Sequence, residues 1–413
     1  VASSNVTIGP TRRDAVMTDE PDGQARPGAN QRLFAGLLAL LLATGWAANH
    51  FAGLIPAMSE RQHLSRSTLD AVFGVYALGL LPGLLIGGRT SDAVGRRPVA
   101  WVGSIVNLAG TLAMLMSQRP DVLLVGRLVV GLGVGLVISS CTAWASDLKG
   151  PAGAAVAGAV LTAGFAVGPF AAGAIASMGA SGVWVSFLVA AVIVIAAAAV
   201  TVLAARRVAT DAPITPSGPQ PESAADQGVA RALSWAIPLA PWAFASATLA
   251  FVTIPTHMHT PLAAPLAAGT AALITNGVSG IIQLVARARR WGPQAGTTGA
   301  VLAALGYAAT AAAPQPIPLG VGVSLMVVLG CASGLVLREG LIDLEAAAPQ
   351  HLRGALTGAF YTVSYIGFGL PMLLSSLGSA HASMIILGVM AALAAATAVG
   401  RAARLRRDSH RQN

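Results

Sequence analysis

The 413-residue chain is 55% hydrophobic and only 10% charged, whereas soluble domains carry about 25% charged residues. Its mean hydropathy is +0.70, so the composition excludes an ordinary soluble globular protein. Long runs of Ala, Leu and Gly predict membrane-spanning helices rather than the short alternating strands of a membrane barrel. The formal net charge of +9 does not predict nucleic-acid binding, because the basic residues lie between and beyond these runs.

Residues 1–33 are polar and rich in Asp, Arg, Gly and Pro, which predicts a disordered cytosolic tail. The apolar run that follows is too long for a signal peptide. About twelve apolar runs then follow, each near the roughly 20 residues that cross a bilayer. They lie near 34–56, 69–88, 99–117, 122–146, 153–177, 182–205, 232–254, 264–286, 296–313, 318–345, 353–377 and 380–400.

The longest interruption, residues 206–231, is rich in Pro, Ser, Asp and Gln, which predicts a cytosolic linker. It separates two sets of six runs, at 34–205 and 232–400, and residues 401–413 form a basic tail. The strings GFAVGP in the fifth run and GFGLP in the eleventh indicate an internal repeat of the kind that transporters contain.

Basic residues gather in the loops on one side of these runs. If the N-terminus lies in the cytosol, the opposite side receives only Arg61, Arg66 and Arg119. Because Lys and Arg concentrate in cytosolic loops, we expect a multi-pass protein of the cell membrane with both termini in the cytosol. The Arg- and Ala-rich composition with a single lysine favours a bacterial source.

The loop after the second run reads GGRTSDAVGRRP and resembles the corresponding loop of the major facilitator superfamily. That resemblance implies an all-α membrane fold with twelve transmembrane helices in two pseudo-symmetric six-helix bundles. It also implies that the loop gates the cytosolic side, and we expect Arg89 to pair with Asp92 at helical spacing. Thr90 and Ala93 depart from the family pattern. The matching residues are Gly88, Ser91, Asp92, Gly95, Arg96 and Arg97.

The fourth and fifth runs carry two further motifs. RLVVGLG resembles the fourth-helix motif of the same superfamily, although Arg127 could instead extend to the interface. GFAVGPFAAG resembles the fifth-helix motif of the twelve-helix drug and proton antiporters, with Ala172 in place of a glycine, and this resemblance favours export. Ordinary small-residue packing is the alternative for both motifs. The matching residues are Arg127, Gly131 and Gly133, then Gly164, Gly168, Pro169 and Gly173.

Two titratable residues are candidates for proton coupling. His50 lies in the first run and Glu339 in the tenth, and intramembrane ionisable residues commonly mark ion pathways. A neutral packed histidine and an interfacial salt-bridge set are the alternatives. Asp70 opens the second run, where we expect it to cap the helix.

Polar and aromatic residues inside the runs are candidates for lining a solute cavity, although each could equally serve helix packing. Cys141 and Cys331 lie inside apolar runs and predict no disulfide. His257 and His259 do not predict a metal site. The cavity candidates are Trp46, Asn49, Tyr76, Trp242, Asn276, Gln283, Tyr361 and Tyr365.

The sequence therefore predicts a secondary active transporter that works by alternating access and exports small organic compounds in exchange for protons. The alternatives are a proton-coupled importer of a small metabolite, and a non-transporting membrane sensor or lipid-handling protein on the same scaffold. We expect a monomer in the lipid bilayer, with no enzymatic activity, no cofactor and no nucleic-acid partner.

Overall fold

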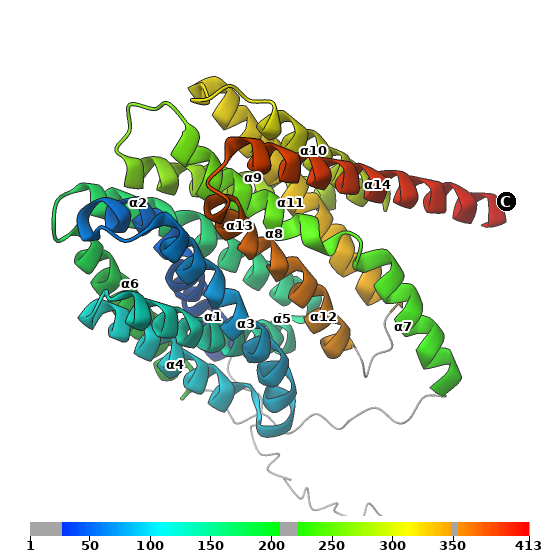
Figure 1. Ribbon diagram of the computed structural model, residues 1–413. Coiled ribbons are helices and arrows are strands. Elements are labelled where there is room, and N and C mark those ends of the chain that lie inside the picture. Colours follow the sequence, from blue (N-terminus) through cyan, green and yellow to red (C-terminus); the bar gives the residue numbers. More distant parts are fainter. Residues whose placement is uncertain (1–26, 207–221, 348–352, 413) are drawn as a thin grey trace, which may run out of the picture.

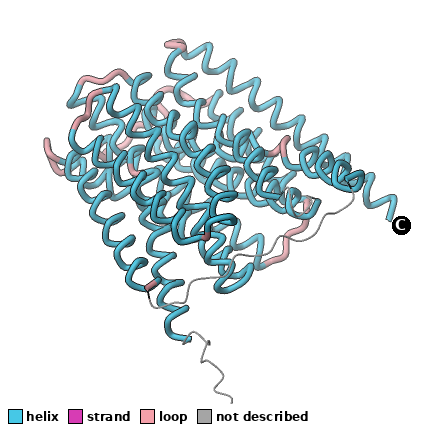
Figure 2. The backbone as a smooth tube through the Cα atoms, turned by 90° about the horizontal axis from the view of Figure 1, so that it is seen from below, coloured by secondary structure: helices cyan, strands magenta, loops and turns pink. Residues whose placement is uncertain are grey.

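The computed structural model describes residues 27–206, 222–347 and 353–412. Across these ranges the chain is almost entirely helical, and one isolated bridge joins Met258 to Ile317. Short loops connect the helices at the two ends of a bundle (Figure 2). Eleven helical segments in the described ranges are long and apolar enough to cross a membrane, which confirms the prediction of an all-α membrane protein.

The first half of the chain forms six membrane-length segments. A break at His50 divides the first into α1 and α2. Non-helical backbone at Lys149 and Gly150 makes the long α5 two successive spans. The bounds are α1 (Pro27–Asn49), α2 (Phe51–Gln62), α3 (Arg66–Val94), α4 (Arg96–Met116), α5 (Pro120–Ser177) and α6 (Gly182–Ala205).

The second half contains more interrupted helices. Its first span passes from α-helix through a π-helical turn into a 3₁₀ turn. Helix α10, which corresponds to the ninth apolar run of the sequence, has 18 residues. The bounds are α7 (Glu222–Ala236), α8 (Ala240–Thr248), η1 (Leu249–Thr253), η2 (Ile254–His257), α9 (Ala264–Ala288), α10 (Gln294–Ala311), α11 (Leu319–Ala347), α12 (Arg353–Tyr365), η4 (Ile366–Gly369), α13 (Leu370–Ser376) and α14 (Ala380–Gln412).

Three segments that we expected outside the bundles are partly helical. Helix α1 begins at Pro27, within the expected N-terminal tail, because proline is favoured in the first turn of a helix. Helix α7 begins at Glu222, within the expected linker, and α14 continues through the expected basic tail. The rest of the expected N-terminal tail (1–26), much of the expected linker (207–221) and the last residue of the expected basic tail (413) lie outside the described residues.

The helices of the two halves lie side by side (Figure 1). Helix α5 packs against α1, α3 and α4 of its own half and against α9 of the second half. We call the end of the bundle where α1 begins and α3 turns into α4 the termini face, and the opposite end, with the α2–α3 turn, the far face.

Large apolar side chains cover the outside of the bundle. Ile105 and Leu78 are 66% and 65% exposed, and Ile281 is 61% exposed in the second half. A soluble protein rarely exposes such residues over a continuous surface. These exposed apolar faces suit contact with lipid, as expected for membrane-spanning helices.

Candidate functional site

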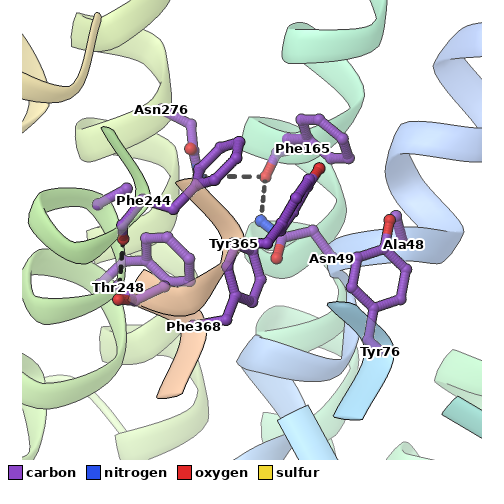
Figure 3. Close-up of a pocket in the computed structure, with 11 residues that line it drawn as sticks. Ala48, Asn49, Tyr76, Phe165, Phe244, Thr248, Asn276, Tyr365 and Phe368 are labelled. Atoms are coloured by element: carbon purple, nitrogen blue, oxygen red, sulfur yellow. Dashed lines mark hydrogen bonds between the residues drawn. The ribbon is translucent and has the colours of Figure 1, made fainter. Parts of the chain in front are cut away.

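A central pocket lies where the two halves meet (Figure 3). Its wall combines residues of α1, α3 and α5 with residues of α8, η1, α9, α12 and η4. Both halves therefore contribute to one site. The lining residues are Ala48, Asn49, Tyr76, Phe165, Phe244, Ala247, Thr248, Phe251, Asn276, Tyr365 and Phe368.

Aromatic rings dominate the pocket wall on the side of the second half. The rings of Phe244 and Tyr365 are stacked with centroids 4.5 Å apart. Phe368 lies 5.2 Å from Tyr365 and 5.4 Å from Phe244, and Tyr76 of the first half is 6.3 Å from Phe368. Rings in these arrangements give a flat apolar surface that suits an aromatic solute.

Two carboxamides from different halves converge on one backbone carbonyl in the pocket. Asn49 donates to the carbonyl oxygen of Phe165 at 2.9 Å. Asn276 donates to the same oxygen at 3.4 Å and to Ala272 at 3.1 Å. These bonds lie inside the aromatic pocket (Figure 3), so they supply its polar contacts without any ionised group.

Half of the predicted cavity residues line this pocket. The seven further lining residues are mostly aromatic or small, and neither their polarity nor their spacing distinguished them from packing residues in the sequence. Phe165 is the lining residue that the sequence could have indicated most clearly, because it lies inside the GFAVGP motif. The predicted residues that line the pocket are Asn49, Tyr76, Asn276 and Tyr365.

The other four predicted cavity residues serve packing contacts outside the pocket wall. Trp46 lies against the backbone of α5, and the indole of Trp242 donates to Thr397 at 3.3 Å. Gln283 donates to Ser279 on its own helix at 3.4 Å. The ring of Tyr361 packs beside Tyr365, with centroids 6.1 Å apart. For these four, the packing alternative describes their positions.

Arg127 is fully buried behind the pocket wall. Its Nη1 donates to the carbonyl of Ala48 at 2.8 Å, and its guanidinium lies over the rings of Tyr76 and Phe51, 4.5 and 5.2 Å from their centroids. Its Nε and Nη2 have no hydrogen-bond partner among the described residues. The alternative of an arginine extending to the interface is therefore wrong.

The motif glycines of α5 and its neighbours allow close helix packing. Any Cβ on Gly131 would collide with the backbone of α3, and one on Gly133 would lie 2.7 Å from the carbonyl oxygen of Gly103. A Cβ on Gly164 would lie 3.0 Å from the Cα of Gly45, and one on Gly168 2.9 Å from the Cα of Trp46. These residues bring α5 against α1, α3 and α4.

Pro169 and Gly173 place α5 at the junction between the halves. The carbonyl oxygen of Pro169 faces Gly53 of α2 and Gly269 of α9, and Gly173 faces the carbonyl of Pro265. A side chain at any of these glycines would strike backbone that cannot rotate away. The fifth-helix motif thus forms part of the contact that closes the pocket toward the far face.

The candidate proton carriers lie outside the pocket wall. His50 is fully buried in the break between α1 and α2. Its Nδ1 is 2.9 Å from the carbonyl of Ala47, and its ring meets Phe187 edge-on with centroids 5.3 Å apart. Its Nε2 has no partner among the described residues. The structure describes this packing, and the coupling role of His50 stays a prediction.

Glu339 belongs to a charged cluster at the termini face of the second half. It is 2% exposed and pairs with Arg338. One turn further along α11, Asp343 pairs with Arg401 of α14 at 2.6 Å. Arg401 also donates to the carbonyl of Pro293 at 3.1 Å, so this cluster joins α11 and α14 to the turn before α10.

The loop motif forms a compact turn at the termini face. Gly95 ends α3 and precedes α4 with φ 96° and ψ 156°, a backbone conformation that favours glycine. Arg96 pairs with Asp92 and binds Asp147 of α5 at 2.9 Å, so the expected pairing of Arg89 with Asp92 is wrong. Arg96 also donates to Ser91 at 2.9 Å.

Ser91 takes part in this contact as an acceptor for Arg96, whereas Gly88 and Arg97 contribute little. Ser91 donates to the carbonyl of Gly88 at 3.0 Å, and a Cβ on Gly88 would meet nothing within 4 Å. Arg97 is half-buried beside the turn. Ser91, Asp92, Gly95 and Arg96 therefore shape the α3–α4 turn, and Arg96 ties it to α5 through Asp147.

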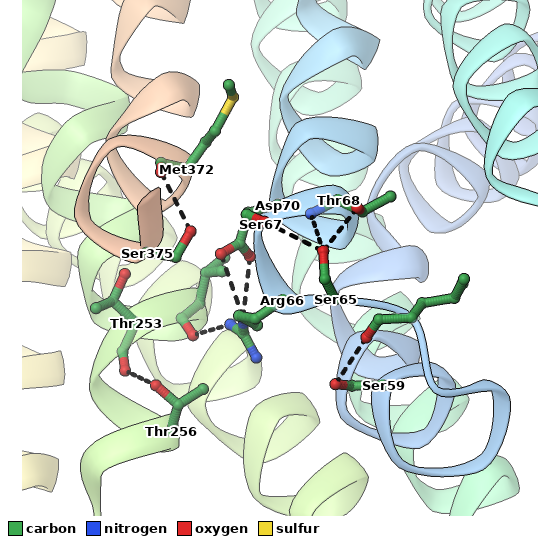
Figure 4. Close-up of polar contacts among 12 residues, drawn as sticks. Ser59, Ser65, Arg66, Ser67, Thr68, Asp70, Thr253, Thr256, Met372 and Ser375 are labelled. Carbon is green, nitrogen blue, oxygen red and sulfur yellow. Dashed lines mark hydrogen bonds and ion pairs between the residues drawn. The ribbon is translucent and has the colours of Figure 1, made fainter. Parts of the chain in front are cut away.

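A polar cluster joins the two halves at the far face (Figure 4), beside a cavity of about 310 Å³ that Arg66 and Val252 also line. Arg66 of α3 pairs with Asp70 at 3.1 Å and donates to the carbonyl of Val252 in η1 at 2.9 Å. Ser375 of α13 lies beside Asp70. Ser65 accepts from the backbone N–H of Thr68 at 3.1 Å and caps α3, so the expectation that Asp70 caps this helix is wrong.

A family model for the Major Facilitator Superfamily matches residues 35–372. The chain is 30% identical to "Multidrug resistance protein MdtL" of Vibrio parahaemolyticus over 97 residues, a stretch that covers 24% of each chain. It is 26% identical over 135 residues to "Probable polyol transporter 6" of Arabidopsis thaliana, which covers 33% of this chain and 27% of the relative. The chain thus spans about a quarter of the length of these relatives.

The fold is similar to solved transporter structures. A POT family transporter in complex with 5-aminolevulinic acid superposes with a TM-score of 0.73 at 12% identity, covering 91% of this chain and 95% of that one. The POT family transporter PepTSo superposes with a TM-score of 0.71 at 13% identity, covering 91% and 98%. At this identity the likeness concerns the fold alone, and the family-model match decides membership. The chain belongs to the major facilitator superfamily and is a multi-pass membrane protein.

Proposed function

We propose that this transporter exports small organic compounds in exchange for protons, by alternating access to the central pocket. The observation that carries the proposal is the pocket itself, which residues of both halves line. When two halves share one site, a rocking motion about it exposes the site first to one face and then to the other.

The contacts between the halves support this motion. At the far face, Arg66 of the first half binds the carbonyl of Val252 in the second, and α5 packs closely on α9 around Pro169 and Gly269. At the termini face, the Arg96 and Arg401 clusters each stay within one half. Separation at the far face would therefore break contacts between the halves and leave these clusters intact.

The distribution of basic residues supports a cytosolic termini face. Three arginines, Arg61, Arg66 and Arg119, lie at the far face. More basic residues lie at the termini face: Arg89, Arg96, Arg97, Lys149, Arg206, Arg231, Arg287, Arg289 and Arg290. Cytosolic loops carry the excess of Lys and Arg in membrane proteins. In this orientation, the Arg96 cluster gates the cytosolic side indirectly, by holding the α3–α4 turn against α5 within the first half, and Asp92 is its acidic member.

The direction of transport draws support from the fifth-helix motif and from a relative. The residues from Gly164 to Gly173 match the antiporter pattern, and one relative is named a multidrug resistance protein. Import of a metabolite is the second candidate, because another relative is named a polyol transporter. His50 and Glu339 remain the proposed proton carriers, since both are buried ionisable residues.

Accumulation in cells tests the proposal. Cells that produce the chain should retain less of a transported aromatic compound than cells without it, and a protonophore should abolish the difference. Cells that produce Asp92→Asn at the same level are the matched control and should behave like cells without the chain. Greater retention in producing cells would favour the importer, and a difference that survives the protonophore would contradict proton coupling.

A further inference from the structure

The wall of the central pocket contains no ionised side chain among its described residues. It consists of six aromatic rings, the carboxamides of Asn49 and Asn276, the hydroxyl of Thr248 and two alanines. Aromatic faces attract an organic cation, but a buried cation is costly unless a carboxylate or comparable counter-charge also compensates it. This wall offers none to a cation.

A positive charge lies directly behind the wall. The guanidinium of Arg127 lies 4.5 Å from the ring centroid of Tyr76 and donates to the carbonyl of Ala48 at 2.8 Å, and both of these residues line the pocket. The side chain of Arg127 is fully buried. Its charge therefore acts on the pocket through one layer of protein, where solvent and salt screen it weakly.

This charge has no acidic partner among the described residues. The ion pairs of the described chain do not include Arg127, and its Nε and Nη2 make no hydrogen bond there. The hydroxyl of Tyr76, in the pocket wall, is also buried without a partner. An anion in the pocket would accept a hydrogen bond from Tyr76 and compensate the charge of Arg127.

We infer that the substrate is an aromatic organic anion, and this inference rests on the proposed function of organic-solute transport. The described cavity of about 30 Å³ holds little more than one water, so the halves must part for the substrate to enter; its ring then packs against Phe244, Tyr365 and Phe368, and its acidic group faces Tyr76. Because unit charges separated by one layer of side chains still interact at an effective dielectric constant of about 20, we expect the pocket to prefer an anion over a matched cation at least ~10-fold in affinity.

Three naphthalene probes of fixed charge test the inference on the full-length wild-type protein in lipid nanodiscs. They are 2-naphthalenesulfonate, 2-naphthalenesulfonamide and 2-naphthyltrimethylammonium, which are anionic, neutral and cationic on the same ring. The sulfonate should bind at least ~10-fold more tightly than the ammonium compound, with the sulfonamide between them. Equal binding of the two ions, or a preference for the ammonium compound, would overturn the inference.

Two variants of Arg127 locate the source of the preference. Arg127→Gln should remove it by weakening sulfonate binding while leaving sulfonamide binding within about twofold, and Arg127→Lys should keep most of it because the positive charge remains. Should Arg127→Gln fail to fold, the wild-type probe series still decides the question. A full anion preference in a folded Arg127→Gln protein would refute the role of this residue.

The outcomes also separate this inference from the proposed function. If no probe of any charge binds, the pocket is not an organic-solute site, and the proposed function and the inference fail together. If the ammonium probe binds best, only the inference fails. If chloride in place of gluconate displaces the sulfonate competitively, an inorganic anion is the partner of Arg127, and the inference is refuted.

Discussion

Gly269 of α9 packs against the backbone of α5 on the far-face side of the pocket. A Cβ at this position would lie 2.8 Å from the Cα of Phe170 and 3.1 Å from the carbonyl carbon of Pro169. Overpacking against fixed atoms costs about 1–3 kcal/mol. Because α5 and α9 belong to different halves, Gly269→Ala should favour the conformation open at the far face by about 5- to 150-fold.

Thiol labelling measures this shift. Ala247 lines the pocket, so Ala247→Cys, with Cys141 and Cys331 replaced by alanine, places one thiol in it. In intact cells, a membrane-impermeant maleimide should label this thiol faster when Gly269→Ala is added, because the pocket then opens more often toward the far face. In the proposed orientation, the far face is the outside of the cell.

Gly277→Ala is the matched control. It lies on the same helix, but a Cβ there would meet nothing within 4 Å, so it should leave the labelling rate unchanged. Two results would show that the contact of Gly269 with α5 does not control opening at the far face. One is an unchanged labelling rate in a normally inserted Gly269→Ala protein, and the other is equal acceleration by both substitutions.

Three further substitutions test the gates and the turn between α3 and α4. Asp92→Asn should leave membrane insertion unchanged and abolish transport, because it removes the ion pair with Arg96 and leaves Asp147 as the one acidic partner of Arg96 among the described residues; normal transport would contradict the gate. Arg66→Gln removes the bond to the carbonyl of Val252 and should speed maleimide labelling of the pocket thiol from the far face. An unchanged labelling rate would show that this bond does not hold the far face together. Gly95→Ala should lower stability by about 1–3 kcal/mol through its positive φ, seen as a lower melting temperature; an unaltered melting temperature would contradict this.

The sequence predicted the membrane fold and the loop motif well, because both depend on local signals. Apolar runs of bilayer length define spans whatever their partners are. Asp92, Gly95 and Arg96 belong to one short motif, and all three lie at the turn between α3 and α4. The pairing within that turn needed the structure, since Arg96, rather than Arg89, reaches both Asp92 and Asp147.

The pocket was harder to predict, because lining it depends on how distant helices meet. Asn49 and Asn276 were found through their polarity inside apolar runs. Phe244 and Phe368 carry no such signal, since an apolar aromatic residue in a membrane helix more often faces lipid or a neighbouring helix. The sequence also carried no sign that the expected linker contains a helix, although the polar segment from Glu222 onward forms the start of α7.

Proton exchange in proteoliposomes tests whether the protein exchanges an organic compound for protons. Purified protein is reconstituted with a pH-sensitive dye inside, and the naphthalene probe that binds most tightly is added outside. An antiporter takes up the probe as protons leave, so the luminal pH should rise in liposomes that contain the protein and stay constant in protein-free liposomes. Probe uptake with a fall in luminal pH would indicate import by symport, and probe uptake without any change in luminal pH would contradict proton-coupled transport.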